Sequence, residues 1–143
     1  MKFSHNVSSS RRKCRKALFS APSHKKRIAM SIHLSKDLRT KYKIRSLPVR
    51  RDDEVRIMVG KKKNTVGKVI NVRRKHNYIE VDRLTREKAN GQQVHIPIHP
   101  SNVELKSFKM TADRKKLIAR RAAVRARDAD KGKITQTEVM KLD

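Results

Sequence analysis

Aromatic and acidic residues are both scarce in this sequence of 143 residues. Aromatic residues make up 3%, Trp is absent, and 13 Asp and Glu residues stand against 39 Lys and Arg residues, which leaves a formal net charge of +26. Only 36% of the residues are hydrophobic, so a core that spans the whole chain is not available. A charge of this size repels itself in a compact state and attracts a polyanion. The composition therefore argues against an isolated soluble enzyme and favours binding to nucleic acid.

Cysteine occurs once, at Cys14. A single thiol forms no intrachain disulfide and no cysteine-cluster zinc site, and it fits a reducing compartment most simply. No run approaches the roughly 18 apolar residues of a membrane-spanning helix, and the N-terminus lacks the apolar core of a secretory signal. Residues 1–36 are rich in Ser, Lys and Arg and contain no acid, so a mitochondrial address stays open.

The charge is distributed unevenly along the chain. Residues 1–51 hold 16 basic residues and one acid, whereas residues 52–108 hold 12 and 7, and residues 109–143 hold 11 and 5. This pattern predicts a division into a basic N-terminal arm over residues 1–48, a folded middle over 49–108, and a basic tail over 109–143.

Strand-like alternation of apolar and polar residues recurs in the middle segment. Short one-sided apolar stripes occur at residues 55–59, 66–72, 79–81, 94–98 and 103–105. Such stripes, joined by polar turns such as Asn90-Gly91, predict a small closed sheet. Pro97 cannot donate a backbone hydrogen bond, so its strand is expected to be an edge or to break there.

The flanks carry helix signals. Ser10 is expected to cap a short helix that runs to Phe19, and Ser35 a turn that runs to Tyr42. In the tail, Thr111 is a good N-cap and is followed by a helix that Gly132 ends or breaks. Its apolar stripe is narrow (Ile118, Ala122, Ala126 and Ala129) and is surrounded by Arg114, Lys115, Arg120, Arg121, Arg125 and Arg127. A protein core alone would not hold so thin a stripe, so we expect this helix to lie on nucleic acid.

Clustered cations without interspersed acids predict contacts with phosphate groups, whose binding releases counterions. Arginine also stacks on unpaired bases, and the scarcity of aromatics favours recognition of RNA shape and backbone. The alternative interpretation of each cluster is a charged surface that is exposed to water and binds no partner. The expected RNA-binding set is Arg11, Arg12, Lys13, Arg15, Lys16, His24, Lys25, Lys26, Arg27, Lys36, Arg39, Lys41, Tyr42, Arg45, Arg50, Lys61, Lys62, Lys63, Lys68, Arg73, Arg74, Lys88, His99, Arg114, Lys115 and Arg121.

Other chemistry finds little support in the sequence. His95 and His99 are about 13 Å apart on an extended chain, so they share a metal ion only if the backbone turns, and His99 reads better as a loop residue that bonds to backbone or phosphate. Cys14 has no base to activate it. Asp52 and Asp53 face opposite ways on a strand and are better read as turn residues or partners of nearby arginines. We expect no enzyme activity, no cofactor and no metal.

Blocks of residues in order along the chain resemble one known family. They are Ala21-Pro22-Ser23-His24, Met30-Ser31, Leu34-Ser35-Lys36, Leu38-Arg39, Lys41-Tyr42, Arg45-Ser46-Leu47-Pro48-Val49-Arg50, Asp52-Asp53-Glu54-Val55, Arg86-Glu87-Lys88-Ala89-Asn90-Gly91, Val94-His95 and Ile98-His99-Pro100-Ser101. The chain is similar to the eukaryotic cytosolic form of the universal large-subunit ribosomal protein twenty-four family, called L twenty-six in the older eukaryotic naming. The resemblance covers nearly the whole chain, although the first 20 residues and the tail after Phe108 match mainly in character.

The resemblance extends to the central strands, which look like the KOW motif that this family shares with transcription elongation factors. It implies a mainly β core, a small SH3-like barrel of the KOW type, with helical and extended basic flanks. The family usually has Lys-Gly in the first loop, where this chain has Lys63-Asn64 and a loop that is one residue shorter. That position is expected to need a left-handed backbone, for which Asn is the least costly substitute for Gly.

Function and location also follow from the resemblance as expectations. It implies a structural constituent of the large (60S) subunit that binds the 5′ domain region of its ribosomal RNA early in assembly. Neighbouring ribosomal proteins and nascent-chain-handling factors near the tunnel exit would be its partners, with no membrane insertion and no homo-oligomer. The location would be the cytoplasmic ribosome after nucleolar passage, and Lys131 or Lys133 in the tail would be an interaction or modification point.

Alternative functions weaken against the same residues. A KOW-type transcription elongation or RNA-processing factor would carry acidic or balanced domains beside the barrel, and this chain has neither. A chromatin protein would fit the charge but not the strand pattern and the specific blocks. A mitochondrial ribosomal protein is a variant of the leading interpretation, against which the eukaryotic-style arm argues.

Overall fold

The computed structural model describes residues 3–4 and 6–130. It contains a β core with helical flanks, as the sequence predicts. The elements in order are α1 (Arg11–Phe19), α2 (Ser23–Ala29), β1 (Ser31–Leu34), α3 (Lys36–Tyr42), β2 (Ser46–Pro48), β3 (Glu54–Ile57), β4 (Val66–Arg73), β5 (Tyr78–Val81), β6 (Thr85–Glu87), β7 (Gln93–His95), a 3₁₀ turn (Pro100–Asn102), β8 (Val103–Ser107) and α4 (Ala112–Asp130).

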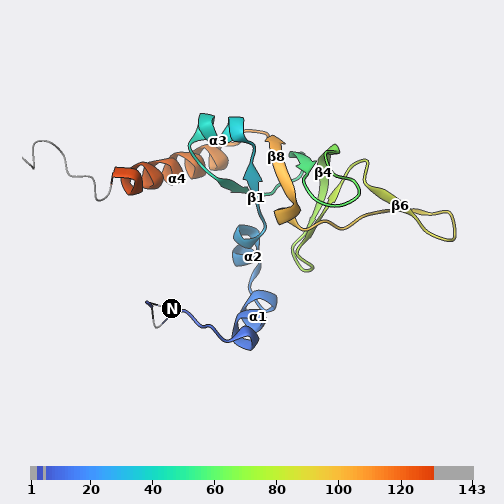
Figure 1. Cartoon of the computed structure of the whole chain (residues 1–143), viewed down its shortest axis with the longest axis horizontal. Helices are drawn as coiled ribbons and strands as arrows, with labels where there is room; N and C mark the ends of the chain where they lie inside the picture. The colour runs from blue at the N-terminus through green and yellow to red at the C-terminus, as the bar shows by residue number, and fades with distance from the viewer. Residues whose placement is uncertain (1–2, 5, 131–143) are drawn as a thin grey trace, which may run out of the picture.

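One six-stranded sheet forms the centre of the molecule, in the order β2-β1-β8-β3-β4-β5. The pairing is antiparallel except between β1 and β8, which run parallel. The strands β6 and β7 form a separate hairpin. Figure 1 shows this hairpin and α4 extending to opposite sides of the sheet, with α1 and α2 on a third side.

The sheet bends at β4 without closing into a ring. Residues Val66 to Lys68 pair with β3, and residues Val69 to Arg73 pair with β5, with a shift in register between Val69 and Asn71. Gly67 at the first half allows a close approach, because a Cβ there would lie 2.7 Å from the carbonyl oxygen of Asp82. Within the described residues, no strand pairing joins β5 back to β2, so the predicted closed sheet is not seen.

Residues 30–49 contribute more to the core than predicted. Their apolar side chains are buried together with those of the central strands; from this segment they are Met30, Ile32, Leu34, Ile44, Leu47 and Val49. The charge pattern had predicted a basic arm here, outside the folded middle. The strands β1 and β2 are only four and three residues long. Their few apolar residues form no clear alternating pattern, and the basic residues around them determine the charge of the segment.

The predicted strands occur with local differences. Val55 and Ile57 are buried in β3, but Val59, which the alternation placed on the same face, is 62% exposed because β3 ends at Ile57. The backbone of Asn64 is left-handed, with φ of 68°, as predicted for this loop position. The strand before Pro97 ends at His95, which confirms the predicted break.

The helix starts follow the predicted residues. Ser10 precedes α1 without a side-chain capping bond, whereas the side chain of Ser35 accepts a hydrogen bond from the backbone N–H of Leu38. Pro22 not only limits α1 but also precedes α2, a helix that the sequence pattern did not predict. Proline at a helix start costs no intrahelical hydrogen bond. Among the described residues, no helix is both long and apolar enough to cross a membrane.

The protein itself holds the first half of α4, contrary to the expectation that nucleic acid would hold it. Arg114 and Ile118 are buried, and Arg121 donates to the carbonyl oxygen of Ser46 at 2.8 Å. These positions, at i, i+4 and i+7, lie on one helical face. Ile118 and Ala122 of the predicted apolar stripe do pack on the core, whereas a pattern of apolar residues does not reveal the two arginines. The predicted end at Gly132 lies outside the described residues.

A buried ion pair joins α4 to the sheet. Arg114 and Asp53 have side-chain exposures of 3% and 1%, and both terminal nitrogens of Arg114 donate to the Asp53 carboxylate, at 2.6 and 2.5 Å. Arg114 also donates to the carbonyl oxygen of Pro48, and its guanidinium lies 5.3 Å from the centre of the Phe108 ring. The same carboxylate accepts the backbone N–H of Arg50.

Replacing Asp53 by Asn is therefore expected to destabilise the fold strongly. It leaves a buried guanidinium without its counter-charge, which costs about 3–5 kcal/mol. Asp113→Asn is the matched control, because Asp113 is 82% exposed and lies 3.7 Å from Arg50, and such a pair contributes under about 1 kcal/mol. Urea unfolding of both variants measures the difference, and equal losses would contradict the role given to Asp53.

Candidate nucleic-acid interface

Five arginines from separate parts of the fold line one groove of about 750 Å³. Arg27 comes from α2, Arg50 and Arg51 from the connection between β2 and β3, and Arg73 and Arg74 from the end of β4 and the turn after it. The backbone of the groove floor is fixed, because Pro48 and Val49 are buried. The fold thus concentrates guanidinium groups that the sequence spreads over 48 positions, from 27 to 74.

Hydrogen bonds hold several of these arginines in place. Arg74 donates to the hydroxyl of Ser23 at 3.1 Å, which joins the β4–β5 turn to α2. Arg50 donates to the hydroxyl of Thr111 at 3.2 Å, which joins the groove to the start of α4. Part of the conformational entropy that these long side chains would lose on binding is therefore already lost in the free protein.

Glu80 is the carboxylate that fixes the remaining end of the groove. It accepts hydrogen bonds from Asn71 at 2.8 Å and from Arg73 at 3.1 Å. The hydrogen bond from Asn71, followed by the bond and charge of Arg73, lowers the pKa of Glu80 below its usual 4.5, although burial acts in the opposite direction. Glu80 is thus ionised at neutral pH and orients Arg73, whose side chain stays 55% exposed.

A second hollow continues the groove along α4. It shares Arg27, Pro48 and Arg50 with the groove and adds Lys116 and Arg120 of α4. Asp113 also lines it, so its charge is partly balanced. The first turns of α4 thus extend the cationic surface from the sheet onto the helix.

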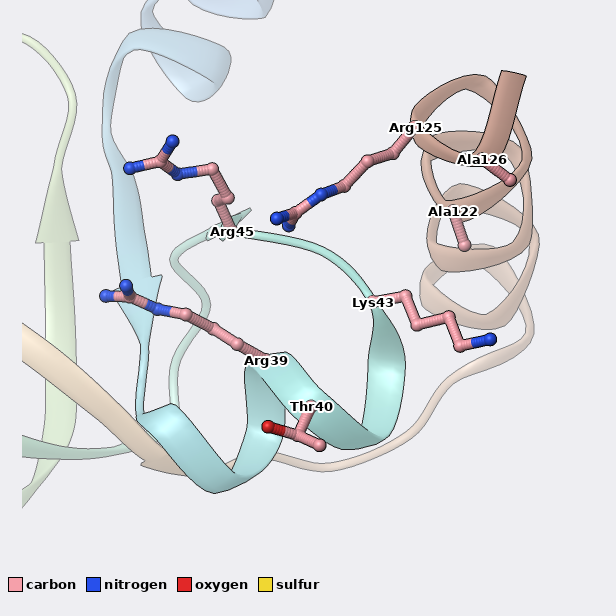
Figure 2. A pocket seen from close by; sticks show the side chains of 7 residues that line it. All are labelled: Arg39, Thr40, Lys43, Arg45, Ala122, Arg125 and Ala126. Carbon is pink, nitrogen blue, oxygen red and sulfur yellow. The ribbon is translucent and has the colours of Figure 1, made fainter. Parts of the chain in front are cut away.

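Two other predicted residues lie in a separate cleft. Arg39 and Arg45 line a space between α3 and α4, together with Lys43 and Arg125 (Figure 2). Arg39 is partly fixed there by a hydrogen bond from its Nε to the carbonyl oxygen of Leu34, at 2.7 Å.

The predicted residues of the N-terminal arm lie on α1 and α2, apart from the core. No residue of α1 is buried, so its whole surface is open to a partner. This helix carries Arg11, Arg12, Lys13, Arg15 and Lys16. His24 and Lys25 are likewise exposed on α2, whereas Lys26 is buried to 9% exposure.

The predicted loop residues are exposed but do not join the groove. Lys61 and Lys62 border a different hollow with His99, between the first loop and the segment after β7. Nδ1 of His99 accepts the backbone N–H of Ser101 at 3.3 Å, which confirms the expected bond to backbone. The exposed Lys63, Lys68, Lys36, Lys41, Lys88 and Lys115 are likewise absent from the residues that line the groove. Within the described part of the chain, no group of three or more His, Cys, Asp or Glu residues could hold a metal ion.

Several members of the predicted set are engaged within the protein. Arg114 borders the hollow on α4, but its guanidinium is buried against Asp53. Tyr42 packs on Phe108, with ring centres 5.5 Å apart, and is thus partly withdrawn from stacking on a base. Arg121 bonds to the Ser46 carbonyl, and Lys26 is largely buried.

Sequence patterns also missed residues that line the groove and its extension. Arg51 was considered only as a partner of the neighbouring aspartates, yet it lines the groove beside Arg50. Lys116 was not singled out, and it lines the hollow on α4. The adjacency of Arg50 and Arg51 was a usable signal, whereas the position of Lys116 depended on how α4 is held.

Glu80→Gln is expected to remove one pH-dependent part of the stability. A carboxyl whose pKa is lowered on folding stabilises the protein above its unfolded pKa, and this stabilisation is lost as the pH falls through the folded pKa. The free energy of unfolding of the wild type should therefore exceed that of Glu80→Gln at pH 7, and the difference should shrink below about pH 4.5. Urea unfolding between pH 7 and 3 measures it; a constant difference would contradict the assignment.

Comparison with known proteins points to one family. The family model that describes the eukaryotic ribosomal proteins L26 and their archaeal counterparts matches residues 8–121. The large ribosomal subunit protein uL24 of Dictyostelium discoideum is 53% identical over 134 residues, which cover 94% of this chain and 95% of that protein. The uL24 proteins of Caenorhabditis elegans and Littorina littorea are each 49% identical, over 141 and 138 residues, and these alignments cover 97% and 95% of this chain and 99% and 96% of those proteins.

These matches confirm the resemblance and do not favour a transcription factor. They agree with the geometry, in which cations from separate segments line shared grooves. The chain belongs to the family of the eukaryotic ribosomal proteins L26 and their archaeal counterparts, which are components of the ribosome rather than enzymes.

Proposed function

We propose that this protein is a structural constituent of the large ribosomal subunit and that its arginine groove binds ribosomal RNA. The observation that carries the proposal is the convergence of Arg27, Arg50, Arg51, Arg73 and Arg74 on one groove. So many guanidinium groups repel one another when the groove is empty, and phosphate groups of RNA would neutralise them. The names of the relatives, which are large ribosomal subunit proteins, support ribosomal RNA as the partner.

Binding would rest on the shape and backbone of folded RNA. Guanidinium groups form paired hydrogen bonds with phosphate oxygens, and they stack on unpaired bases. Aromatic residues make up only 3% of the chain, and Tyr42 is engaged with Phe108, so few aromatic rings remain to stack on successive bases. The remaining exposed cations of the predicted set would extend the contact around the groove.

The proposed organisation follows the core. Residues 1–29 would form an RNA-binding arm, because α1 buries no side chain. Residues 30–108 would form the folded body, because the hydrophobic core begins at Met30. Within the body, residues 49–108 would be a KOW-type unit of the SH3-like class. The bend of β4 between β3 and β5 supports this, since a small barrel is built from strands that pair with both neighbours around a bend.

The location proposed for the protein is the cytoplasmic ribosome, reached through the nucleolus during assembly. The family resemblance of the sequence supports a place on the 5′ domain region of the RNA, near the nascent-chain exit, beside other large-subunit proteins. The exposed α1 and the hairpin of β6 and β7 give the body extensions that suit contact with more than one neighbour.

The groove is expected to set the salt dependence of RNA binding. Arg51→Gln with Arg74→Gln should weaken binding to purified large-subunit RNA and reduce the slope of log affinity against log salt by about two units, one for each lost phosphate contact. Arg83→Gln with Arg86→Gln removes the same charge from exposed positions outside the groove, and should change the slope much less. Equal slopes for both double variants would contradict a special role for the groove.

Association with the subunit can be tested in cells. The full chain should co-sediment with the large subunit on a sucrose gradient, and should remain there after a wash in about half-molar salt, which strips loosely held basic proteins. Loss on washing, or sedimentation with polymerase or chromatin, would overturn the proposed function.

A further inference from the structure

The cleft between α3 and α4 has a composition that the arginine groove does not share. Arg39, Lys43 and Arg45 line it from α3 and the segment after it, and Arg125 lines it from α4, in a space of about 700 Å³. Figure 2 shows Arg125 extending from α4 toward Arg45, while Lys43 extends from the end of α3 toward α4. Lys43 and Arg125 therefore extend into one space, whereas Arg39 and Arg45 border it with their guanidinium groups turned away from α4.

The α4 wall of this cleft contains two small apolar side chains. Ala122 and Ala126 line the cleft beside Arg125 and lie one helical turn apart (Figure 2). Ala122 is half-buried and packs on the core, whereas Ala126 is exposed. A wall of small apolar side chains beside guanidinium groups suits a flat ring that carries a negative group.

Both walls are held in place without a ligand. Arg121 bonds α4 to the Ser46 carbonyl, and Arg39 is bonded to the Leu34 carbonyl. Lys43 ends α3 with a left-handed backbone, φ of 55°, and its N–H donates to the carbonyl oxygen of Arg39. The cleft is therefore a feature of the folded protein, and a ligand would not need to create it.

Among the described side chains, only basic ones carry charge in the lining of the cleft. Its lining holds four basic side chains and no acid, in contrast to the hollow that Asp113 borders and the groove that Glu80 adjoins. Cations gathered at the C-terminal end of α3 are favoured by the helix dipole. They nevertheless repel one another across the cleft, and this repulsion is relieved only when an anion enters.

We propose that the α3–α4 cleft binds one unpaired nucleotide of the ribosomal RNA, with its base against Ala122 and Ala126 and its phosphates on Lys43 and Arg125, while Arg39 and Arg45 add positive charge at the border of the cleft. The proposal rests on the proposed RNA binding and adds a defined subsite to it. The volume falls in the range of roughly 300–1,000 Å³ that small-molecule sites occupy, so a whole nucleotide fits. A base that leaves its helix can stack on guanidinium planes as well as on the apolar wall.

Filling the apolar wall tests the inserted base directly. Ala126→Phe blocks the cleft without changing the charge, and Val124→Phe adds the same ring on the opposite face of α4, since two residues turn the helix by about 200°. Both positions are exposed, Val124 by 52%. The full chain is mixed with purified large-subunit ribosomal RNA, and affinity and the chemical reactivity of each unpaired base are measured.

The wild type is expected to protect one unpaired base that Ala126→Phe leaves reactive, with an affinity loss of roughly tenfold for the lost stacking. Val124→Phe should keep both the protection and the affinity. If Ala126→Phe and Val124→Phe give the same reactivities, or if Ala126→Phe weakens binding without exposing a base, the subsite is overturned while the proposed function stands. If the wild type itself does not bind the RNA, the proposed function fails instead.

Two double variants test the cationic rim of the cleft, which is formed by Lys43 and Arg125. Lys43→Gln with Arg125→Gln should expose the same base as Ala126→Phe, because the phosphates of that nucleotide lose their partners. Lys109→Gln with Arg127→Gln removes the same charge from exposed positions before and within α4, outside the cleft lining, and should leave that base protected. Exposure of the base in both pairs, or in neither, would overturn the assignment of the rim.

Discussion

The carboxylate of Asp53 accepts both terminal nitrogens of Arg114 and the backbone N–H of Arg50, at a point almost closed to water. A charge in such a place is tolerated only with its partner, so the pair dictates where the start of α4 lies. Because Arg50 is bonded to the same carboxylate and to Thr111, the arginine groove is built around this one interaction. The hollow on α4 and the α3–α4 cleft depend on it too, since each has α4 as a wall.

A net charge of +26 on a small core causes electrostatic repulsion, and the cations of the fold fall into two groups. Where a cation supports the structure it is paired, as Arg114 is with Asp53 and Arg56 with Glu104. Where cations line the grooves they are mostly left without acids, and hydrogen bonds to neutral groups orient them instead. The Arg74 bond to Ser23 and the Arg39 bond to a backbone carbonyl are of this kind. Such bonds position a guanidinium and leave its charge available to a phosphate.

Local sequence patterns predicted much of the fold correctly. The alternation in residues 55–57 and 66–72 gave β3 and β4, Ser35 and Thr111 precede helices as expected, and Asn64 takes the left-handed backbone. Failures came where the signal was short or of the wrong chemical kind. The three-residue β2 lies among basic residues, which masked it. On α4, the apolar pattern found Ile118 and Ala122 but not Arg114 and Arg121, which also fasten the helix to the body. Similarly, Arg51 and Lys116 can be identified as lining residues only after the fold has placed them beside residues from distant segments.

The sequence by itself determined the chemistry of this protein. An excess of Lys and Arg with few aromatics selects a polyanionic partner, and the ordered family blocks identify the relatives, because both are properties of composition and local order. The tertiary structure alone decided which cations are exposed for binding a partner and which are paired within the protein. The sequence does not distinguish the roles of Arg50 and Arg114. In the fold, Arg50 lines the groove and Arg114 is buried against Asp53. Long-range packing makes this choice, since Arg114 is buried against Asp53 and Pro48, which lie 61 and 66 positions away in the sequence.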